Sequence, residues 1–123
     1  MEFLQRDEMV YLVNIGFAAC MKGKIALARS LFADLLELQP DLKGARTGLA
    51  FSYIVTDEFE RGDEILQKLL DDDPNDLDIK AFLAFSKALQ HKADEVQELT
   101  AGITQKDSTA YNLARQAQEL AAR

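Results

Sequence analysis

The chain has 123 residues, of which 48% are apolar, with two prolines and no tryptophan. This length suffices for one globular domain with a core, and the composition excludes a disordered tail. The formal net charge of −7 argues against nucleic acid or an anionic membrane as a partner, because both are bound through clustered Lys and Arg. A protein partner stays open.

The first eight residues lack the basic start and apolar run of a signal peptide. The nearly apolar stretch 9–21 is interrupted by Asn14 and is shorter than the roughly 20 residues that span a bilayer. Cys20 is the single cysteine, so no intrachain disulfide can form, which is compatible with a reducing compartment. We therefore expect a cytoplasmic protein.

The sequence repeats with a period of 34 residues. Pro40 and Pro74 lie one period apart, and each follows a leucine-rich run. Five further sets of matched residues fall in register: Phe17, Phe51 and Phe85; Ile15, Leu49 and Leu83; Gly16, Ala50 and Ala84; Leu31, Ile65 and Leu99; and Leu35, Leu69 and Ile103. This register predicts repeats at residues 9–42, 43–76 and 77–110.

Each repeat is expected to open with a helix and to turn near residues 22–24, 56–58 or 90–92. A second, amphipathic helix follows, which Pro40 or Pro74 ends. The third repeat is degenerate, and its second helix is expected to include Gly102, at a cost of about 1 kcal/mol. A last helix, at about residues 108–122 and capped by Ser108, would close the core.

These features resemble the tetratricopeptide repeat, a 34-residue helix pair with small residues where its helices cross. The matching residues are Leu12, Gly16, Ala19, Gly23, Ala28, Phe32 and Pro40 in the first repeat, and Leu49, Ala50, Tyr53, Phe59, Gly62, Leu66, Leu69 and Pro74 in the second. The resemblance implies an all-α, right-handed α-solenoid of three helix pairs plus a C-terminal capping helix, with residues 1–123 as a single domain. It also implies a concave groove, lined by the first helices, that binds another polypeptide.

The first helices are apolar nearly all round and should therefore be covered on every side. The side chains expected to face the groove are Val13, Phe17, Cys20, Met21, Phe51, Ile54, Val55, Phe82, Phe85 and Leu89, with Ala81 and Ala88 at equivalent places. An amphipathic helix or an extended apolar segment of a partner would cover them. Phe3 and Leu4, the last helix, or a homodimer are the alternatives.

Other candidate sites are less convincing. Some members of the family grip a carboxylate with Lys, Arg or Asn in the groove. In this sequence the corresponding places are occupied by Val13, Phe17, Gly44, Gly48, Asp78 and Phe82, so that binding mode is not expected. The acidic run 71–76 lacks the Gly and Glu of a calcium loop and should cap the next helix. His91 has no second metal-binding residue near it, Cys20 should be buried and inert, and segment 44–48 lacks the phosphate-loop pattern. We expect no metal, no cofactor and no catalysis.

The size, acidity, repeat number and apolar groove resemble the small bacterial chaperones of type III secretion, which are cytosolic and hold an apolar segment of a client. That resemblance implies a chaperone. The alternative is a scaffold or adaptor, or a self-associating repeat protein. An empty apolar groove would make the chaperone poorly soluble when expressed alone, whereas a self-covered adaptor would be a well-behaved monomer.

Overall fold

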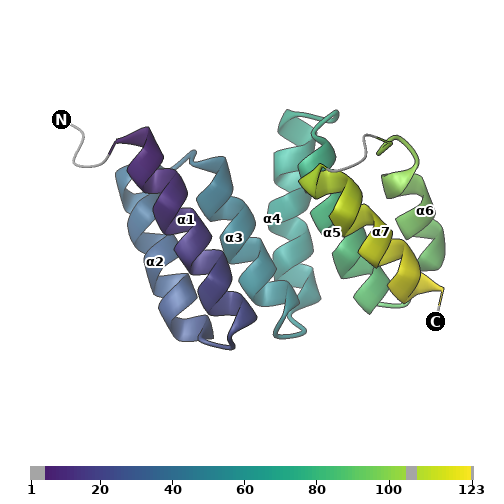
Figure 1. Ribbon diagram of the computed structural model, residues 1–123, viewed down its shortest axis with the longest axis horizontal. Coiled ribbons are helices and arrows are strands. Elements are labelled where there is room, and N and C mark those ends of the chain that lie inside the picture. The colour runs from purple at the N-terminus through teal and green to yellow at the C-terminus, as the bar shows by residue number, and fades with distance from the viewer. Residues whose placement is uncertain (1–4, 105–107, 123) are drawn as a thin grey trace. The chain divides into compact units, whose positions relative to one another are not determined.

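The computed structural model describes residues 5–104 and 108–122, which form seven α-helices and no strand (Figure 1). The helices are α1 (Arg6–Met21), α2 (Ile25–Leu38), α3 (Lys43–Ile54), α4 (Phe59–Asp72), α5 (Leu77–Leu89), α6 (Ala93–Thr100) and α7 (Thr109–Ala121). Three helix pairs followed by one helix confirm the predicted all-α helical repeat. The chain divides within α4 into two compact units, residues 1–62 and 63–123. The handedness of the solenoid and the single-domain organisation stay predictions.

The turn inside each helix pair repeats the same backbone geometry. Gly23, Asp57 and His91, one period apart, all have a positive φ, of 78°, 64° and 62°. The amide of the next residue donates in each case to a carbonyl five residues earlier, at 2.8, 2.8 and 2.9 Å. Left-handed backbone suits glycine best and costs energy for other residues. His91 therefore occupies a structural turn position.

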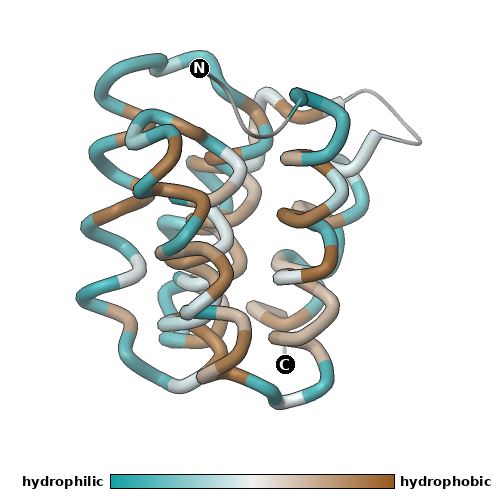
Figure 2. Tube along the Cα trace, turned by 90° about the vertical axis from the view of Figure 1, so that its left-hand side faces the viewer, coloured by the Kyte–Doolittle hydropathy of each residue, from teal (hydrophilic) through white to brown (hydrophobic). Residues whose placement is uncertain are grey.

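Phe32 of α2 lies at the centre of the first unit, fully buried. A Cβ atom added to Gly16 of α1 would lie 2.5 Å from its ring, and one added to Gly48 of α3 would lie 2.2 Å from it. The Phe17 ring meets Phe32 edge-on at 5.7 Å between centroids, and it lies 5.6 Å from the Phe51 ring. Glycines on α1 and α3 thus make room for one large aromatic ring between them. Figure 2 shows hydrophobic and hydrophilic residues interspersed along the helices, as expected for helices with one buried side.

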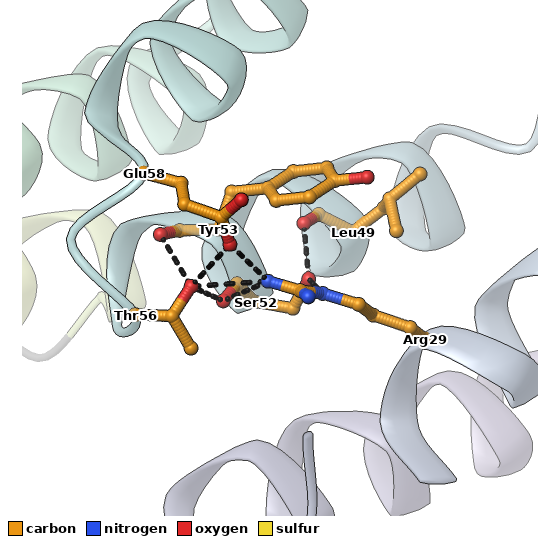
Figure 3. A network of polar contacts seen from close by, with 6 residues as sticks. All are labelled: Arg29, Leu49, Ser52, Tyr53, Thr56 and Glu58. Atoms are coloured by element: carbon orange, nitrogen blue, oxygen red, sulfur yellow. Dashed lines mark hydrogen bonds and ion pairs between the residues drawn. The ribbon is translucent and has the colours of Figure 1, made fainter. Parts of the chain in front are cut away.

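Polar side chains join the first helix pair to α3 (Figure 3). The Arg29 guanidinium donates to Ser52 Oγ at 3.0 Å, to Thr56 Oγ1 at 3.0 Å and to Glu58 Oε2 at 2.9 Å. It also lies over the Tyr53 ring, 4.4 Å from the centroid. The hydrogen bond from Thr56, followed by that from Arg29, lowers the pKa of the Glu58 carboxyl below its ordinary value. We call this group the Arg29 network.

The second unit repeats this network with the charge reversed. Asp63 stands one period after Arg29, and it accepts hydrogen bonds from Ser86 Oγ and from Gln90 Nε2, the latter at 2.9 Å. Ser86 and Gln90 stand one period after Ser52 and Thr56. Lys87 Nζ lies 3.2 Å from Asp63 and supplies the opposite charge. At each of these two helix junctions, a buried serine from the first helix of a repeat (Ser52 or Ser86) therefore bonds to a charged residue of the preceding helix (Arg29 or Asp63).

The last helix closes the second unit. α7 packs against α5 and α6, and its alanines form clusters with apolar residues of those helices: Ala81 with Ala110 and Ala114, and Ala84, Ala88 and Val96 with Ala117. Ser108 Oγ accepts a hydrogen bond from the Tyr111 amide at 3.0 Å, which confirms the predicted N-cap. The Asp76 carboxylate likewise caps α5 by accepting from the Ile79 amide at 3.2 Å.

One expected helix is shorter than the sequence indicated. α6 ends at Thr100, so Gly102 lies beyond the helix, and the expected cost of a glycine in the helix interior does not arise. The chain turns there, because the Ile103 amide donates to the Thr100 carbonyl at 3.0 Å. Thr100 Oγ1 also accepts from Gln118 Nε2 at 2.9 Å, which ties the end of α6 to α7.

Candidate functional site

The predicted groove residues of the first unit serve mostly as core. Cys20, Phe51 and Ile54 are buried, and Phe51 is only 7% exposed. Phe51 packs against Phe17, and Ile54 contacts the position where a side chain on Gly62 would lie. These three side chains therefore belong to the core of the first unit, and the expectation that they also face a partner stays a prediction. Met21 and Val55 are exposed, and their part in binding stays a prediction.

In the second unit the last helix covers part of the predicted groove side. Ala81 and Ala88 are buried in clusters that include residues of α7. Phe85 packs against the second of these clusters and, like Phe82 and Leu89, is partly exposed. Coverage by the last helix, one of the alternatives left open by the sequence, is therefore found for α5. The other internal candidates, Phe3 and Leu4, lie outside the described residues.

An open cleft of about 520 Å³ lies in the first unit, between the start of α1, the α2–α3 connection and the start of α3. It is lined by Arg6, Met9, Val10, Val13, Gln39, Leu42, Lys43 and Gly44. Val13 is thus the one predicted groove residue in its lining. Met9 and Val13 are buried and form its floor, whereas Val10 is 51% exposed at its mouth.

The cleft follows from the repeat register. Met9 and Val10 lie near the start of α1, which begins at Arg6, and Lys43 and Gly44, one period later, begin α3. A Cβ atom on Gly44 would lie 3.2 Å from Val13 Cγ1, so the glycine lets α3 approach α1 closely. α2 ends at Leu38, before Pro40, and the extended residue Leu42 then leads into α3. The starts of two successive first helices and the connection between the repeats therefore form the walls.

Two cationic side chains line the cleft although the protein is acidic overall. Arg6 and Lys43 are both exposed and both line it. The N-cap residue Leu42 makes no side-chain capping hydrogen bond, and the first turn of α3 has no acidic residue, so the amide end of α3 adds a partial positive charge. Asp7 and Glu8 in the first turn of α1 do not belong to the lining. An apolar floor beneath two cations can hold an apolar side chain next to an anionic group.

Most of the lining was missed from the sequence. Arg6, Val10 and Lys43 were not singled out, and Gly44 was noted only for lacking a charge and for standing in a segment without the phosphate-loop pattern. The available signal was the position in the repeat, because residues 9–10 and 43–44 occupy the same places at the start of successive predicted repeats. Hydrophobicity alone does not reveal such a site, because its exposed part combines one valine with two cations.

The groups considered for chemistry are otherwise accounted for. Burial raises the pKa of the Cys20 thiol, against a smaller lowering effect of Arg29, and the side chain is buried as predicted. Among the described residues, no three His, Cys, Asp or Glu side chains are grouped so that they could hold a metal ion. A search of the same residues found no helix with the length and apolarity to cross a bilayer.

Comparison with known proteins agrees with the fold. A search among curated proteins and another among solved structures gave no match. The family profile described as "Tetratricopeptide repeat" matches residues 21–85, just over half of the 123 residues. That span covers α2, α3 and α4 and most of α5. The chain belongs to the tetratricopeptide repeat family, whose helix pairs form protein-interaction modules.

Proposed function

We propose that the chain binds a short polypeptide segment in the cleft of the first unit. An apolar side chain of the segment lies on the floor formed by Met9 and Val13, beside Val10. An acidic side chain or a C-terminal carboxylate lies between Arg6 and Lys43. The observation that carries the proposal is the combination of an exposed apolar residue and two exposed cations around one cavity.

The size of the cleft favours a partner segment that inserts a single apolar side chain over a partner that binds as a long helix. A volume of about 520 Å³ falls within the range of sites that hold small ligands or single side chains. An extended segment with one apolar anchor matches these walls better than the long amphipathic helix considered from the sequence, because the aromatic side chains of the first unit pack against one another.

The cellular role follows from how much apolar surface is left open. Phe32 and Phe51 are buried in the first unit, and α7 covers Ala81 and Ala88 in the second. This self-coverage favours an adaptor that recognises a short motif. The chaperone role resembling type III secretion, and the cytoplasmic location, stay predictions from the sequence. A chain that stays soluble without large aggregates when expressed alone, and that binds little hydrophobic dye, would support the adaptor.

The test is selection from a displayed library of random peptides, followed by measurement of the affinity of the selected peptides. We expect the selected peptides to share an apolar residue near an acidic residue or a free C-terminus. Val10→Glu should abolish their binding, because it places a negative charge at the mouth of the cleft. Leu27→Glu is the matched control, because Leu27 is also an exposed apolar residue, 59% exposed against 51% for Val10, and it does not line the cleft.

A second variant tests the electrostatic part. Arg6→Glu should weaken binding of the acidic peptides at low salt more than at high salt, because salt screens exposed charges. Circular dichroism of each variant should match the wild type, because the substituted side chains are exposed. Equal loss with Val10→Glu and Leu27→Glu, or selected peptides without acidic groups, would contradict the proposal.

A further inference from the structure

One side of α1 carries a stripe of exposed residues that we call the α1 seam. Its members are Asp7, Tyr11, Asn14, Ile15, Ala18 and Lys22, all exposed in the described chain. Steps of three and four residues place them along one side of the helix. Tyr11 is 67% exposed, which is unusual for an aromatic residue in the middle of a helix in this protein. The seam is distinct from the lining of the cleft.

The equivalent side of the other first helices is buried. Ala45 and Ile79, which stand one and two periods after Tyr11, are 0% and 1% exposed. Ser52 and Ser86, which stand at the place of Ala18, are fully buried. Both serines bond to a charged residue of a preceding helix, Arg29 or Asp63. The repeat thus uses this side of a first helix for contact with another helix, and in α1 the same side is open.

The α1 seam is complementary to itself when two copies run antiparallel. Asp7 of one copy then lies opposite Lys22 of the other, and the large Tyr11 lies opposite the small Ala18. Asn14 and Ile15 meet near the two-fold axis. A parallel arrangement would instead bring like charges together at both ends. Large against small residues also lets two helices approach to the usual 8–10 Å between axes.

We propose that the α1 seam is a homodimer interface in which two copies pair antiparallel about a two-fold axis. A two-fold interface uses the same surface on both copies, which is what this self-complementary pattern provides. Exposed Met21 borders the seam and adds apolar surface. One helix from each copy forms a small interface, so we expect a weak dimer that dissociates on dilution.

The test is sedimentation velocity of the full chain without any peptide, between about 1 µM and about 500 µM. We expect a monomer at the low end and a dimer at the high end. Lys22→Glu should raise the dimer dissociation constant about tenfold, because it creates two like-charge contacts with Asp7. Asp7→Lys should do the same. The double variant Asp7→Lys/Lys22→Glu restores both pairs and should return to within about threefold of the wild type.

Lys24→Glu provides the matched control, because it makes the same change in net charge at an exposed residue outside the seam. It should leave the dissociation constant unchanged. A monomer at all concentrations, an effect of Lys24→Glu equal to that of Lys22→Glu, or failure of the double variant to restore association would each overturn the proposal. Peptide binding is a separate readout, since neither Asp7 nor Lys22 lines the cleft.

Discussion

Replacement of Gly48 by alanine tests the packing of the first unit most directly. The added Cβ atom would lie 2.2, 2.4 and 2.7 Å from three carbons of the Phe32 ring, whereas ordinary contacts begin at about 3.4 Å. The ring has little room to move, because a Cβ atom at Gly16 would already lie 2.5 Å from it on another side. We therefore expect Gly48→Ala to force a displacement of α3 or of the ring.

The magnitude follows from two opposing effects. Alanine in a helix interior is favoured over glycine by about 1 kcal/mol. Overpacking of a well-packed core costs about 1–3 kcal/mol, and an overlap of more than 1 Å belongs at the upper end. We expect Gly48→Ala to lower the free energy of unfolding by about 2 kcal/mol in urea titrations. Gly44→Ala is the matched control in the same helix. The nearest atom to its added Cβ would be Val13 Cγ1 at 3.2 Å, so the substitution should change the free energy of unfolding little.

A second substitution checks the cause. Phe32→Leu alone should cost about 1–2 kcal/mol, because it leaves a cavity. In the double variant the smaller leucine gives the new methyl group space, so the combined loss should be at least about 1 kcal/mol smaller than the sum of the single losses. Additive losses, or a Gly48→Ala variant as stable as the wild type, would refute the role assigned to the ring.

Three further outcomes are expected. Asp57→Gly should raise the free energy of unfolding by about 0.5 kcal/mol in urea titrations, because Asp57 has a positive φ; a loss of stability would contradict this. The pKa of Glu58 is lowered by hydrogen bonds from Thr56 and then Arg29, so its stabilising effect is complete above the ordinary carboxyl pKa and is lost as the pH falls through the folded value. Thr56→Val should raise this pKa in an NMR titration, and an unchanged value would assign the shift elsewhere. Cys20 should react with a thiol reagent about tenfold or more slowly in the folded than in the unfolded chain, and equal rates would show that it is accessible.

The repeat architecture was predictable because it depends on local and periodic signals. The period of 34 residues, the small residues where helices cross and the capping residues Asp76 and Ser108 are all visible in the sequence, and the structure confirms them. The end of α6 was not predictable in the same way. Its last turn is fixed by contacts with α7, such as that between Thr100 and Gln118.

The candidate site was harder to predict, for a physical reason. A helix that is apolar nearly all round does not reveal which side faces the core, so Phe51 and Ile54 were assigned to a groove although they are buried. The cleft depends instead on where helices begin and on the missing side chain of Gly44. Those features bring together residues that carry no shared chemical pattern in the sequence.

The reversed charges at the two helix junctions give the repeats a fixed order. Arg29 meets Glu58 at the first junction, whereas Asp63 meets Lys87 at the second. A helix pair docked one repeat too far along the chain would bring Arg29 toward Lys87, and the like charges would repel. Helix pairs of the same architecture are thus kept from exchanging neighbours during folding, so a chain engineered with its repeats permuted should fold less reliably than one in the native order.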